Sequence, residues 1–440
     1  MIEPHPFYEE FARWAPAAKP SAAVMSLAKR YVARAERRPD DLGRALRAAR
    51  EGDVVASCAF ARTALAGEPR PAEREGARAI AAAALATADQ ARGGELYDDA
   101  AGWRPNGPHA LASLLLFAEL SRNVEPWCLS LIARAGRGAA PQLRLAALRA
   151  RIAAARRVGL PEPDLARLID ELADESNGKA AIGQRLSAVV YMTGASDLTA
   201  RLLERFPALA GRAESDAVTA RLLLDLAPSS LSAEAAGAAR LVAEAEADSA
   251  AFWGDLAASA RRVAVVGNSP CDIGRGLGPE IDDHDVALRF NGAPEDGTYA
   301  ADYGARCDVK MMAPRYWNDW ATRTRAPVIL VRQMQAVSED CAFLRLMRSV
   351  GKRVAFTPSR INMALHRELG RLPSSGLIAL ATMKDARGSL ANVRCYGFSL
   401  VDQLGASPET HYYDAEHPAG RHEWRSERAL FDRWFADAGS

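Results

Sequence analysis

The hydrophobic pattern of the chain changes near residue 260, and this change limits what the chain can fold into. Before that point apolar residues recur every three or four positions, as at Leu145, Leu148 and Ile152, which is the spacing of one helical face. After it, short apolar runs alternate with helical stretches, which is typical of a largely parallel sheet covered by helices on both faces. The runs are Val263–Val266, Asp285–Phe290, Val309–Met312, Val328–Val331, Arg353–Phe356 and Val393–Phe398.

The chain of 440 residues exceeds the usual size of one domain, so we predict two. Residues 1–256 are expected to form an all-helical domain, either a bundle or an irregular α-solenoid, because short Gly, Pro and Ser breaks separate its helices. Residues 257–440 are expected to form a Rossmann-like α/β domain. The predicted helical segments of the first part include 74–92, 108–121, 126–136, 142–158, 180–193, 213–226 and 231–246.

Charge and composition exclude several classes of protein. Lys+Arg 56 against Asp+Glu 55 argues against a nucleic-acid binder that relies on a global positive field. No secretory signal is visible, and the most apolar runs, 79–88 and 110–120, are far shorter than the ~20 residues of a membrane span. The six cysteines form no CxxC pair, which favours free thiols over a zinc site. We therefore expect a cytoplasmic protein, with docking at the inner face of the membrane through the helical domain as an open alternative.

The first predicted strand runs directly into Gly267-Asn268-Ser269. In doubly wound folds ligands bind at the carboxyl ends of strands, so this turn is a candidate site. Gly267 lets the backbone turn closely, and the Asn268 amide can bind a sugar, a base or a phosphate. Neither G-x-G-x-x-G nor a GK[ST] loop follows, so a dinucleotide or ATP site is poorly supported.

An acidic cluster, Asp282, Asp283 and Asp285, comes before the second strand. It is open to interpretation as a metal site of the kind used by transferases of diphosphate sugars. The alternative is structural: Asp285, at the start of the strand, would accept hydrogen bonds from backbone donors, and Arg289 would pair with one of the acids.

Histidines cluster near the C-terminus, at His411, His417 and His422, beside tyrosines and acids. Glu427 follows His422 by five positions, at the front of an amphipathic helix. Because an imidazole titrates near neutral pH, with a reference pKa of ~6.5, this clustering in an α/β protein favours acid–base chemistry over a purely structural role.

Four short motifs occur in a fixed order in the second half of the chain. They are Val263-Ala-Val-Val-Gly-Asn-Ser extending to Ala301-Asp-Tyr-Gly, then Pro373-Ser-Ser-Gly with Tyr396-Gly-Phe, then His411-Tyr-Tyr-Asp, and finally His422 with Glu427. In this order they resemble glycosyltransferase family 29, the animal-type sialyltransferases. The resemblance covers about 262–434 and leaves out the first 255 residues, and we interpret the chain as a bacterial homologue.

The resemblance implies a variant GT-A fold and an inverting transfer of a sialic acid, or a related ulosonic acid, from a CMP-sugar to an acceptor glycan or glycolipid. His422 would be the general base on the acceptor hydroxyl, His411 would support the leaving phosphate, and Glu427 would orient the helix or ring of His422. The donor would be bound by Asn268, Ser269, Asn291, Ser374, Ser375, Gly376, Ser399 and Tyr412. Because the leaving group is a monophosphate ester, histidine, tyrosine and backbone donors can stabilise it, so we expect no metal and no other cofactor.

The sequence departs from the family at two positions where family members carry a disulfide. Val263 and Leu390 occupy these positions, and we predict no bridge between the displaced Cys271 and Cys395. We interpret the product as a bacterial surface polysaccharide. Three alternatives remain open: a transferase of the same fold that uses CMP-Kdo as donor, a helical scaffold whose second domain binds CMP without turnover, and an oxidoreductase on a Rossmann-like sheet.

Overall fold

The computed structural model describes the second half of the chain almost completely. The described residues are 41, 44, 60, 63, 141–258, 260–313, 320–333, 337, 341–369, 372–399, 411–413 and 424–438. The chain divides into two compact units, Met1–Val158 with Asp174–Asn177 and Gly159–Ala173 with Gly178–Ser440. In the first unit the structure describes chiefly helix α9 (Pro141–Val158). No helix in the described ranges is both long and apolar enough to cross a membrane.

The second unit contains most of helix α10 (Glu162–Ser176), whose last three residues belong to the first unit. It continues with helices that pack on one another, which are α11 (Ala180–Thr193), α12 (Leu198–Arg205), α13 (Ala217–Leu226) and the long α14 (Ala233–Ala257), with a 3₁₀ turn at Pro207–Arg212. Two of them start at side-chain caps, because Asp216 and Ser232 accept hydrogen bonds from the backbone N–H groups of Thr219 and Ala235.

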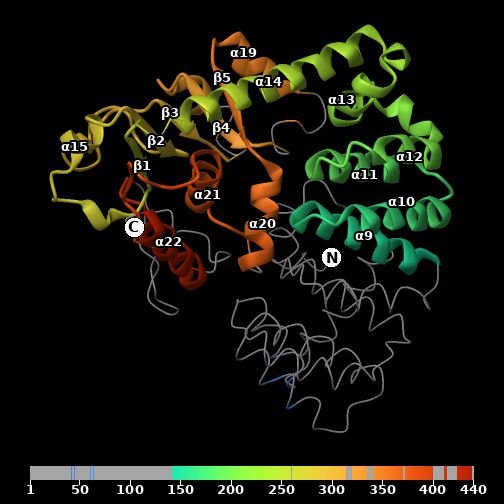
Figure 1. Cartoon of the computed structure of the whole chain (residues 1–440), viewed down its shortest axis with the longest axis horizontal. Helices are drawn as coiled ribbons and strands as arrows, with labels where there is room; N and C mark the ends of the chain where they lie inside the picture. The colour runs from blue at the N-terminus through green and yellow to red at the C-terminus, as the bar shows by residue number, and fades with distance from the viewer. Residues whose placement is uncertain are drawn as a thin grey trace, which may run out of the picture. The chain divides into compact units, whose positions relative to one another are not determined.

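A six-stranded parallel sheet follows, in the order β5-β4-β3-β2-β1-β6 (Figure 1). Its strands are β1 (Val263–Val266), β2 (Val286–Phe290), β3 (Val309–Met311), β4 (Val328–Arg332), β5 (Arg353–Thr357) and β6 (Val393–Tyr396). β1 is the second strand from one edge, and its Val263 lies opposite Val286 of β2 on one side and Val393 of β6 on the other. The connecting helices are α15 (Gly278–Asp282), α16 (Ala300–Tyr303), α17 (Trp320–Arg323), α19 (Ala342–Ser349), α20 (Ser359–Leu369) and α21 (Ser375–Arg387), and α22 (Trp424–Ala438) comes last.

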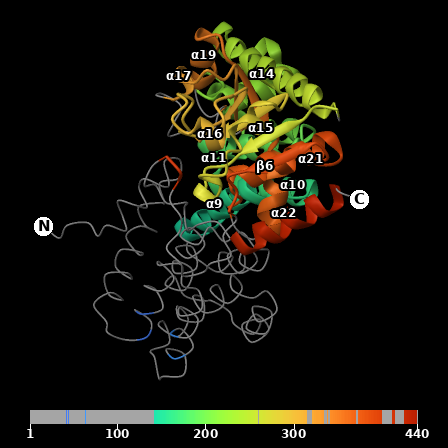
Figure 2. The same cartoon turned by 90° about the vertical axis from the view of Figure 1, so that its left-hand side faces the viewer.

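Helices cover both faces of the sheet, which explains why most of its strand residues are apolar and buried. One face packs against α20, α21 and α22 with the end of α14, and Leu288, Val309 and Leu330 are among its buried strand residues. The other face packs against α19 and the earlier part of α14, around Ile329 and Val331. Figure 2 shows α21 and α22 close to β6 at one edge of the sheet.

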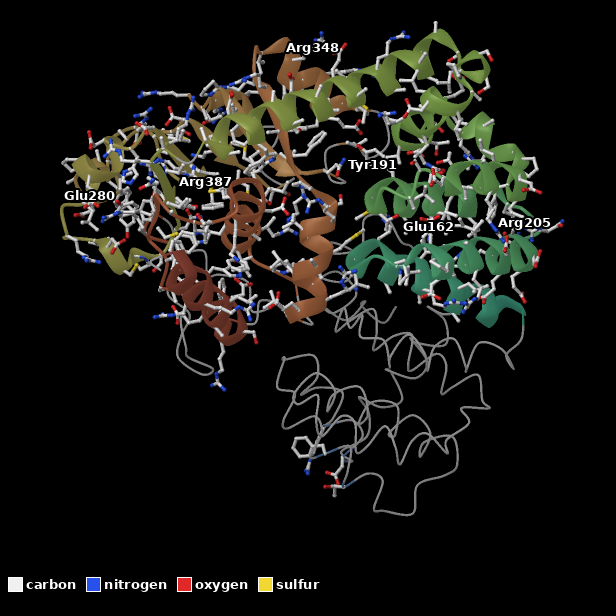
Figure 3. The ribbon with its side chains drawn as sticks, in the orientation of Figure 1. Glu162, Tyr191, Arg205, Glu280, Arg348 and Arg387 are labelled. Atoms are coloured by element: carbon white, nitrogen blue, oxygen red, sulfur yellow. The ribbon has the colours of Figure 1, made fainter. Side chains whose placement is uncertain are left out.

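Helix α14 also closes the other edge of the sheet at β5. The Phe356 N–H donates to Ser249 Oγ at 2.8 Å, and the Phe356 C=O accepts from Trp253 Nε1 at 2.7 Å. Side chains of α14 therefore satisfy backbone groups that an edge strand would otherwise leave open. The end of the helix is fixed as well, because Arg387 donates to the carbonyl oxygens of Leu256 and Arg261 (Figure 3).

All six predicted strands are confirmed, each within two residues of its predicted bounds at either end. The predicted helices at 142–158, 180–193, 213–226 and 231–246 are present, although α14 continues to Ala257 and α12 was not predicted. The predicted segments 74–92, 108–121 and 126–136 lie outside the described residues. The second unit extends across residue 256, and the division into domains at that position stays a prediction.

Candidate functional site

The order of the strands indicates where a ligand site would lie. From β1 the chain builds outward through β2, β3 and β4 to β5, and it then returns to place β6 on the other side of β1. This reversal is the topological switch point of the sheet, and in open α/β folds the crevice for ligands lies there, beyond the carboxyl ends of the strands. The loops after β1 and β6 are therefore the natural walls of a site.

These two loops are in direct backbone contact. The Ser269 N–H donates to the carbonyl of Gly397 at 3.0 Å. A Cβ atom on Gly267 would lie 2.4 Å from the same carbonyl oxygen, so this position has room only for a glycine. Glycine was expected here for a tight backbone turn, and the structure gives a further reason, the close approach of the Gly397 carbonyl.

Tyr303 and Asp272 hold this pair of loops in place. The Tyr303 hydroxyl donates to the Ser269 carbonyl at 2.6 Å and accepts from the Asp272 N–H at 3.2 Å. The buried carboxylate of Asp272 accepts from the Gly397 N–H at 2.7 Å. Neither residue was predicted to belong to the site, and the only signal for Asp272 in the sequence is its place four residues after Asn268.

Asn268 brings the His411 segment to the first strand. The Tyr412 N–H donates to the Asn268 carbonyl at 3.0 Å, so the third motif lies against the turn after β1. The side-chain Oδ1 of Asn268 is buried and has no hydrogen-bond partner among the described residues. A buried acceptor without a partner is costly, which suggests that a ligand donor completes it.

The two residues of the third motif have different surroundings. The Tyr412 ring is buried and stacks on the Tyr303 ring with 3.9 Å between centroids. Burial raises the pKa of the Tyr412 hydroxyl to about 12, against an opposing effect of Arg289, so the phenol is neutral at physiological pH. His411 is partly exposed, and its ring stacks on the Tyr413 ring at 5.3 Å.

The N-terminus of α21 forms the next part of the site. Ser374 is its N-cap, and its Oγ accepts from the Leu377 N–H at 3.2 Å; Ser375 and Gly376 form the first turn. A Cβ on Gly376 would lie 2.6 Å from the ring of Phe398. The same ring lies beside Gly267, so Phe398 brings the helix and the β1 turn together, and Ser399 follows it directly in the chain.

Asn291 directly follows β2. Its backbone is in the left-handed conformation with φ 47°, which asparagine tolerates better than most residues. Its Oδ1 accepts from the Ala313 N–H at 3.0 Å, so the side chain joins the carboxyl ends of β2 and β3. Phe290, the residue before it, contacts Phe398 with 6.3 Å between ring centroids, which places Asn291 near the same group of loops.

Glu427 lies in the first turn of α22 and is fully buried. Its Oε1 accepts from the Ser374 N–H at 2.8 Å. The carboxylate therefore contacts the N-terminus of α21. Its expected partner, His422, lies outside the described residues. The predicted front of an amphipathic helix is confirmed, because Leu430 and Trp434 are both buried in the core.

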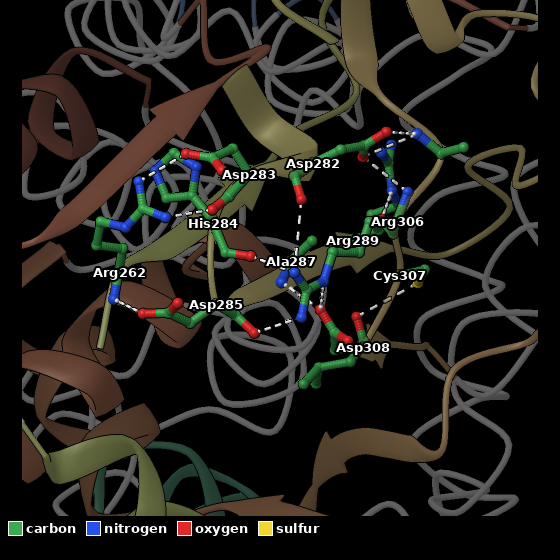
Figure 4. A network of polar contacts seen from close by, with 12 residues as sticks. Arg262, Asp282, Asp283, His284, Asp285, Ala287, Arg289, Arg306, Cys307 and Asp308 are labelled. Carbon is green, nitrogen blue, oxygen red and sulfur yellow. Dashed lines mark hydrogen bonds and ion pairs between the residues drawn. The ribbon is translucent and has the colours of Figure 1, made fainter. Parts of the chain in front are cut away.

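The acidic cluster before β2 binds donors of the chain itself (Figure 4). Asp282 accepts from the backbone N–H groups of Ala305 and Arg306, and Asp285 accepts from the Arg262 N–H at 2.8 Å, as the structural alternative predicted. The prediction that Arg289 pairs with one of the acids of this cluster is wrong.

The fully buried Arg289 guanidinium donates to the carbonyl oxygens of Arg306 and Tyr303. Within the described residues no group of three or more His, Cys, Asp or Glu side chains is arranged to hold a metal ion.

The structure thus brings most of the predicted donor residues to one end of the sheet. Contacts join the segments of Asn268 and Ser269, of Ser374–Gly376, of Ser399 and of His411–Tyr412, with Asn291 at the neighbouring strand end. Val263 and Leu390, at the family's cysteine positions, are buried in the same core cluster, and Cys271 and Cys395 are free thiols.

Residues 238–355 match the family model of glycosyltransferase family 29 (sialyltransferase). The match begins within α14, earlier than the start of the resemblance near residue 262. A comparison with curated proteins finds no match.

Two solved structures of a mammalian sialyltransferase, one of them in complex with Gal-beta-1-3GalNAc-ortho-nitrophenol, are similar at 21% and 22% identity, with TM-scores of 0.29 and 0.30. Each alignment covers 40% of this chain and 66% of the other, just under two thirds of the relative's length.

Proposed function

We propose that the chain transfers a sialic acid from CMP-sialic acid to a hydroxyl group of an acceptor glycan, because residues 238–355 match the family model of glycosyltransferase family 29. The observation that supports this most directly is the group of loops beyond β1 and β6. There the Asn268 side-chain oxygen, which is buried and has no hydrogen-bond partner among the described residues, lies with the first turn of α21 and the His411–Tyr412 segment around the loops after β1 and β6.

The chemistry of these groups suits a nucleoside monophosphate donor. The N–H groups of the first turn of α21 and the Ser374 and Ser375 hydroxyls are suited to an anion such as the donor's carboxylate or phosphate. The Asn268 Oδ1 is suited to a donor group of the ribose or the cytosine. Tyr412 presents a neutral phenol, which can donate a hydrogen bond.

The finer steps of the reaction are part of the same proposal. His422 removes the proton from the acceptor hydroxyl, His411 stabilises the departing phosphate, and the configuration at the anomeric carbon is inverted. No metal takes part, because one phosphate ester is a leaving group that hydrogen-bond donors can support. We also propose a cytoplasmic location. The helical region would dock on a membrane surface or on a partner protein.

A donor screen with the full chain tests this function. Purified protein is incubated with CMP-sialic acid, CMP-Kdo or a UDP-sugar, each with a panel of galactose-terminated acceptors and with or without EDTA. We expect release of CMP from CMP-sialic acid that EDTA does not reduce, and a sialylated product whose new linkage has the inverted anomeric configuration. Consumption of CMP-Kdo alone would move the assignment to that donor. Calorimetric CMP binding without turnover of any donor would favour the non-catalytic scaffold.

Asn291 offers a test of the nucleotide site in particular. In Asn291→Asp the Oδ1 contact with Ala313 is kept but the amide donor is lost, so we expect the CMP dissociation constant to rise about tenfold with little change in melting temperature. Asn291→Ala removes both groups and should lower affinity and stability together. Calorimetry and thermal unfolding measure the two effects. If Asn291→Asp leaves CMP affinity unchanged, Asn291 does not contact the nucleotide.

A further inference from the structure

One peptide group in the proposed donor site is held from both ends by side chains of distant segments. The carbonyl oxygen of Pro373 accepts from Arg332 Nη2 at 3.3 Å, and the N–H of Ser374 donates to Glu427 Oε1 at 2.8 Å. These two groups belong to the same peptide bond, which joins Pro373 to Ser374. None of the four motifs includes Arg332.

The geometry of a trans peptide places the two side chains on opposite sides of this loop. Its C=O and N–H point in opposite directions, and the described residues contain no cis peptide bond. Arg332 therefore approaches from the carboxyl end of β4, and Glu427 approaches from the first turn of α22. Rotation of the peptide plane would break both contacts at once.

The position of this peptide determines where α21 begins. Ser374 is the N-cap, so its backbone angles set the direction of the first turn and of the N–H groups of Ser375 and Gly376. Pro373, with its fixed φ and its lack of an N–H, limits the loop further. Hydrogen bonds to charged groups are among the stronger ones in proteins, so Arg332 and Glu427 are well suited to hold it.

The end of β4 that carries Arg332 is itself fixed on its other side. The neighbouring Gln333 accepts from the N–H and hydroxyl of Ser359 and donates to the Tyr191 hydroxyl at 2.9 Å. Tyr191 in turn donates to Glu246 of α14 at 2.5 Å. Helices α11 and α14 thus support the strand end from which Arg332 reaches the loop, and Figure 3 labels Tyr191 on α11.

We propose that Arg332 is a positioning residue for the donor: together with Glu427 it fixes the Pro373–Ser374 peptide, so that the first N–H groups of α21 meet the anionic part of the CMP-sugar. This inference rests on the proposed function for the identity of the ligand. The contact itself, however, can be measured without any ligand.

The test compares Arg332→Met with Arg332→Lys and with a matched control, Arg353→Met. Arg353 is an exposed arginine at the amino end of the adjacent strand β5, far along the strands from the proposed site. Steady-state kinetics with CMP-sialic acid give kcat and the donor KM. Hydrogen exchange of the segment 372–380 without ligand reports on the peptide itself, and thermal unfolding reports on the fold.

We expect Arg332→Met to raise the donor KM about tenfold, with kcat within about threefold of the wild type, and to speed exchange at Ser374 and Leu377. Arg332→Lys, which keeps a donor at shorter reach, should recover part of the KM. Arg353→Met should match the wild type in all three measurements. A double mutant with Glu427→Gln should raise the donor KM by less than the product of the two single effects, because both side chains hold one peptide.

An active wild type whose donor KM and exchange are both unchanged by Arg332→Met would overturn the inference. So would a loss of kcat and melting temperature at constant KM, since that is the result of a merely structural role. If the wild type turns over no donor, the proposed function fails and the positioning role fails with it. Faster exchange in Arg332→Met would then show only that Arg332 holds the loop.

Discussion

Replacement of Gly267 by alanine is expected to lower the free energy of unfolding by about 3 kcal/mol, the upper part of the range for overpacked sites. The new Cβ would lie 2.4 Å from the Gly397 carbonyl oxygen and 2.9 Å from the Phe398 ring. Both neighbours are held in place, the carbonyl by the Ser269 N–H and the ring between two glycines, so the loops after β1 and β6 must separate. Thermal unfolding should show a melting temperature about 5 °C lower.

The matched control is Gly254→Ala. Gly254 lies on an exposed position of α14 with no heavy atom within 4 Å of an added Cβ, and alanine is the better helix former, so stability should stay the same or rise slightly. CMP binding should be lost in Gly267→Ala and kept in Gly254→Ala. Equal melting temperatures for Gly267→Ala and the wild type would contradict the close approach of the two loops.

The largest kinetic effect is expected for His422→Ala. If His422 is the general base, its removal should reduce kcat by roughly 10²–10⁴-fold, the usual contribution of positioned proton transfer, with CMP affinity nearly unchanged. The assignment comes from the His422–Glu427 spacing. Of these two residues the structure describes Glu427. It contacts the N-terminus of α21, which belongs to the proposed donor site.

His417→Ala is a suitable comparison, because His417 lies five residues before His422 in the sequence and no role is assigned to it. Stopped assays that measure CMP release, together with calorimetry of CMP, separate turnover from binding. We expect wild-type turnover in His417→Ala. Turnover at the wild-type rate in His422→Ala would remove His422 as the base while leaving the donor site intact.

The strands could be predicted from the sequence because they are short and mostly apolar, and burial on both faces of a parallel sheet favours that pattern. Val263–Val266 and Val328–Val331 illustrate it. The continuation of α14 to Ala257 was harder to predict. Its last turns carry Phe252 and Trp253, whose burial depends on the sheet that follows rather than on a local helical stripe.

The motif residues could be located because they follow strands or begin helices, where turn chemistry is visible in the sequence. Arg332, Asp272 and Tyr303 could not be assigned in the same way. Each acts through backbone groups of segments at least 31 residues away, as the contacts of Arg332 with Pro373 and of Tyr303 with Ser269 show. Such contacts depend on which strand ends become neighbours, and local spacing does not contain that information.

The hydrogen bonds of Ser249 and Trp253 to Phe356 have a consequence for any shortened form of this protein. A fragment that begins at residue 257, where the pattern of the sequence changes, would lack α14 and would leave the outer backbone groups of β5 open. Such an exposed strand invites pairing with other chains, so that fragment should self-associate. Fragments for expression should therefore begin before Ala233, where the helix that shields the sheet starts.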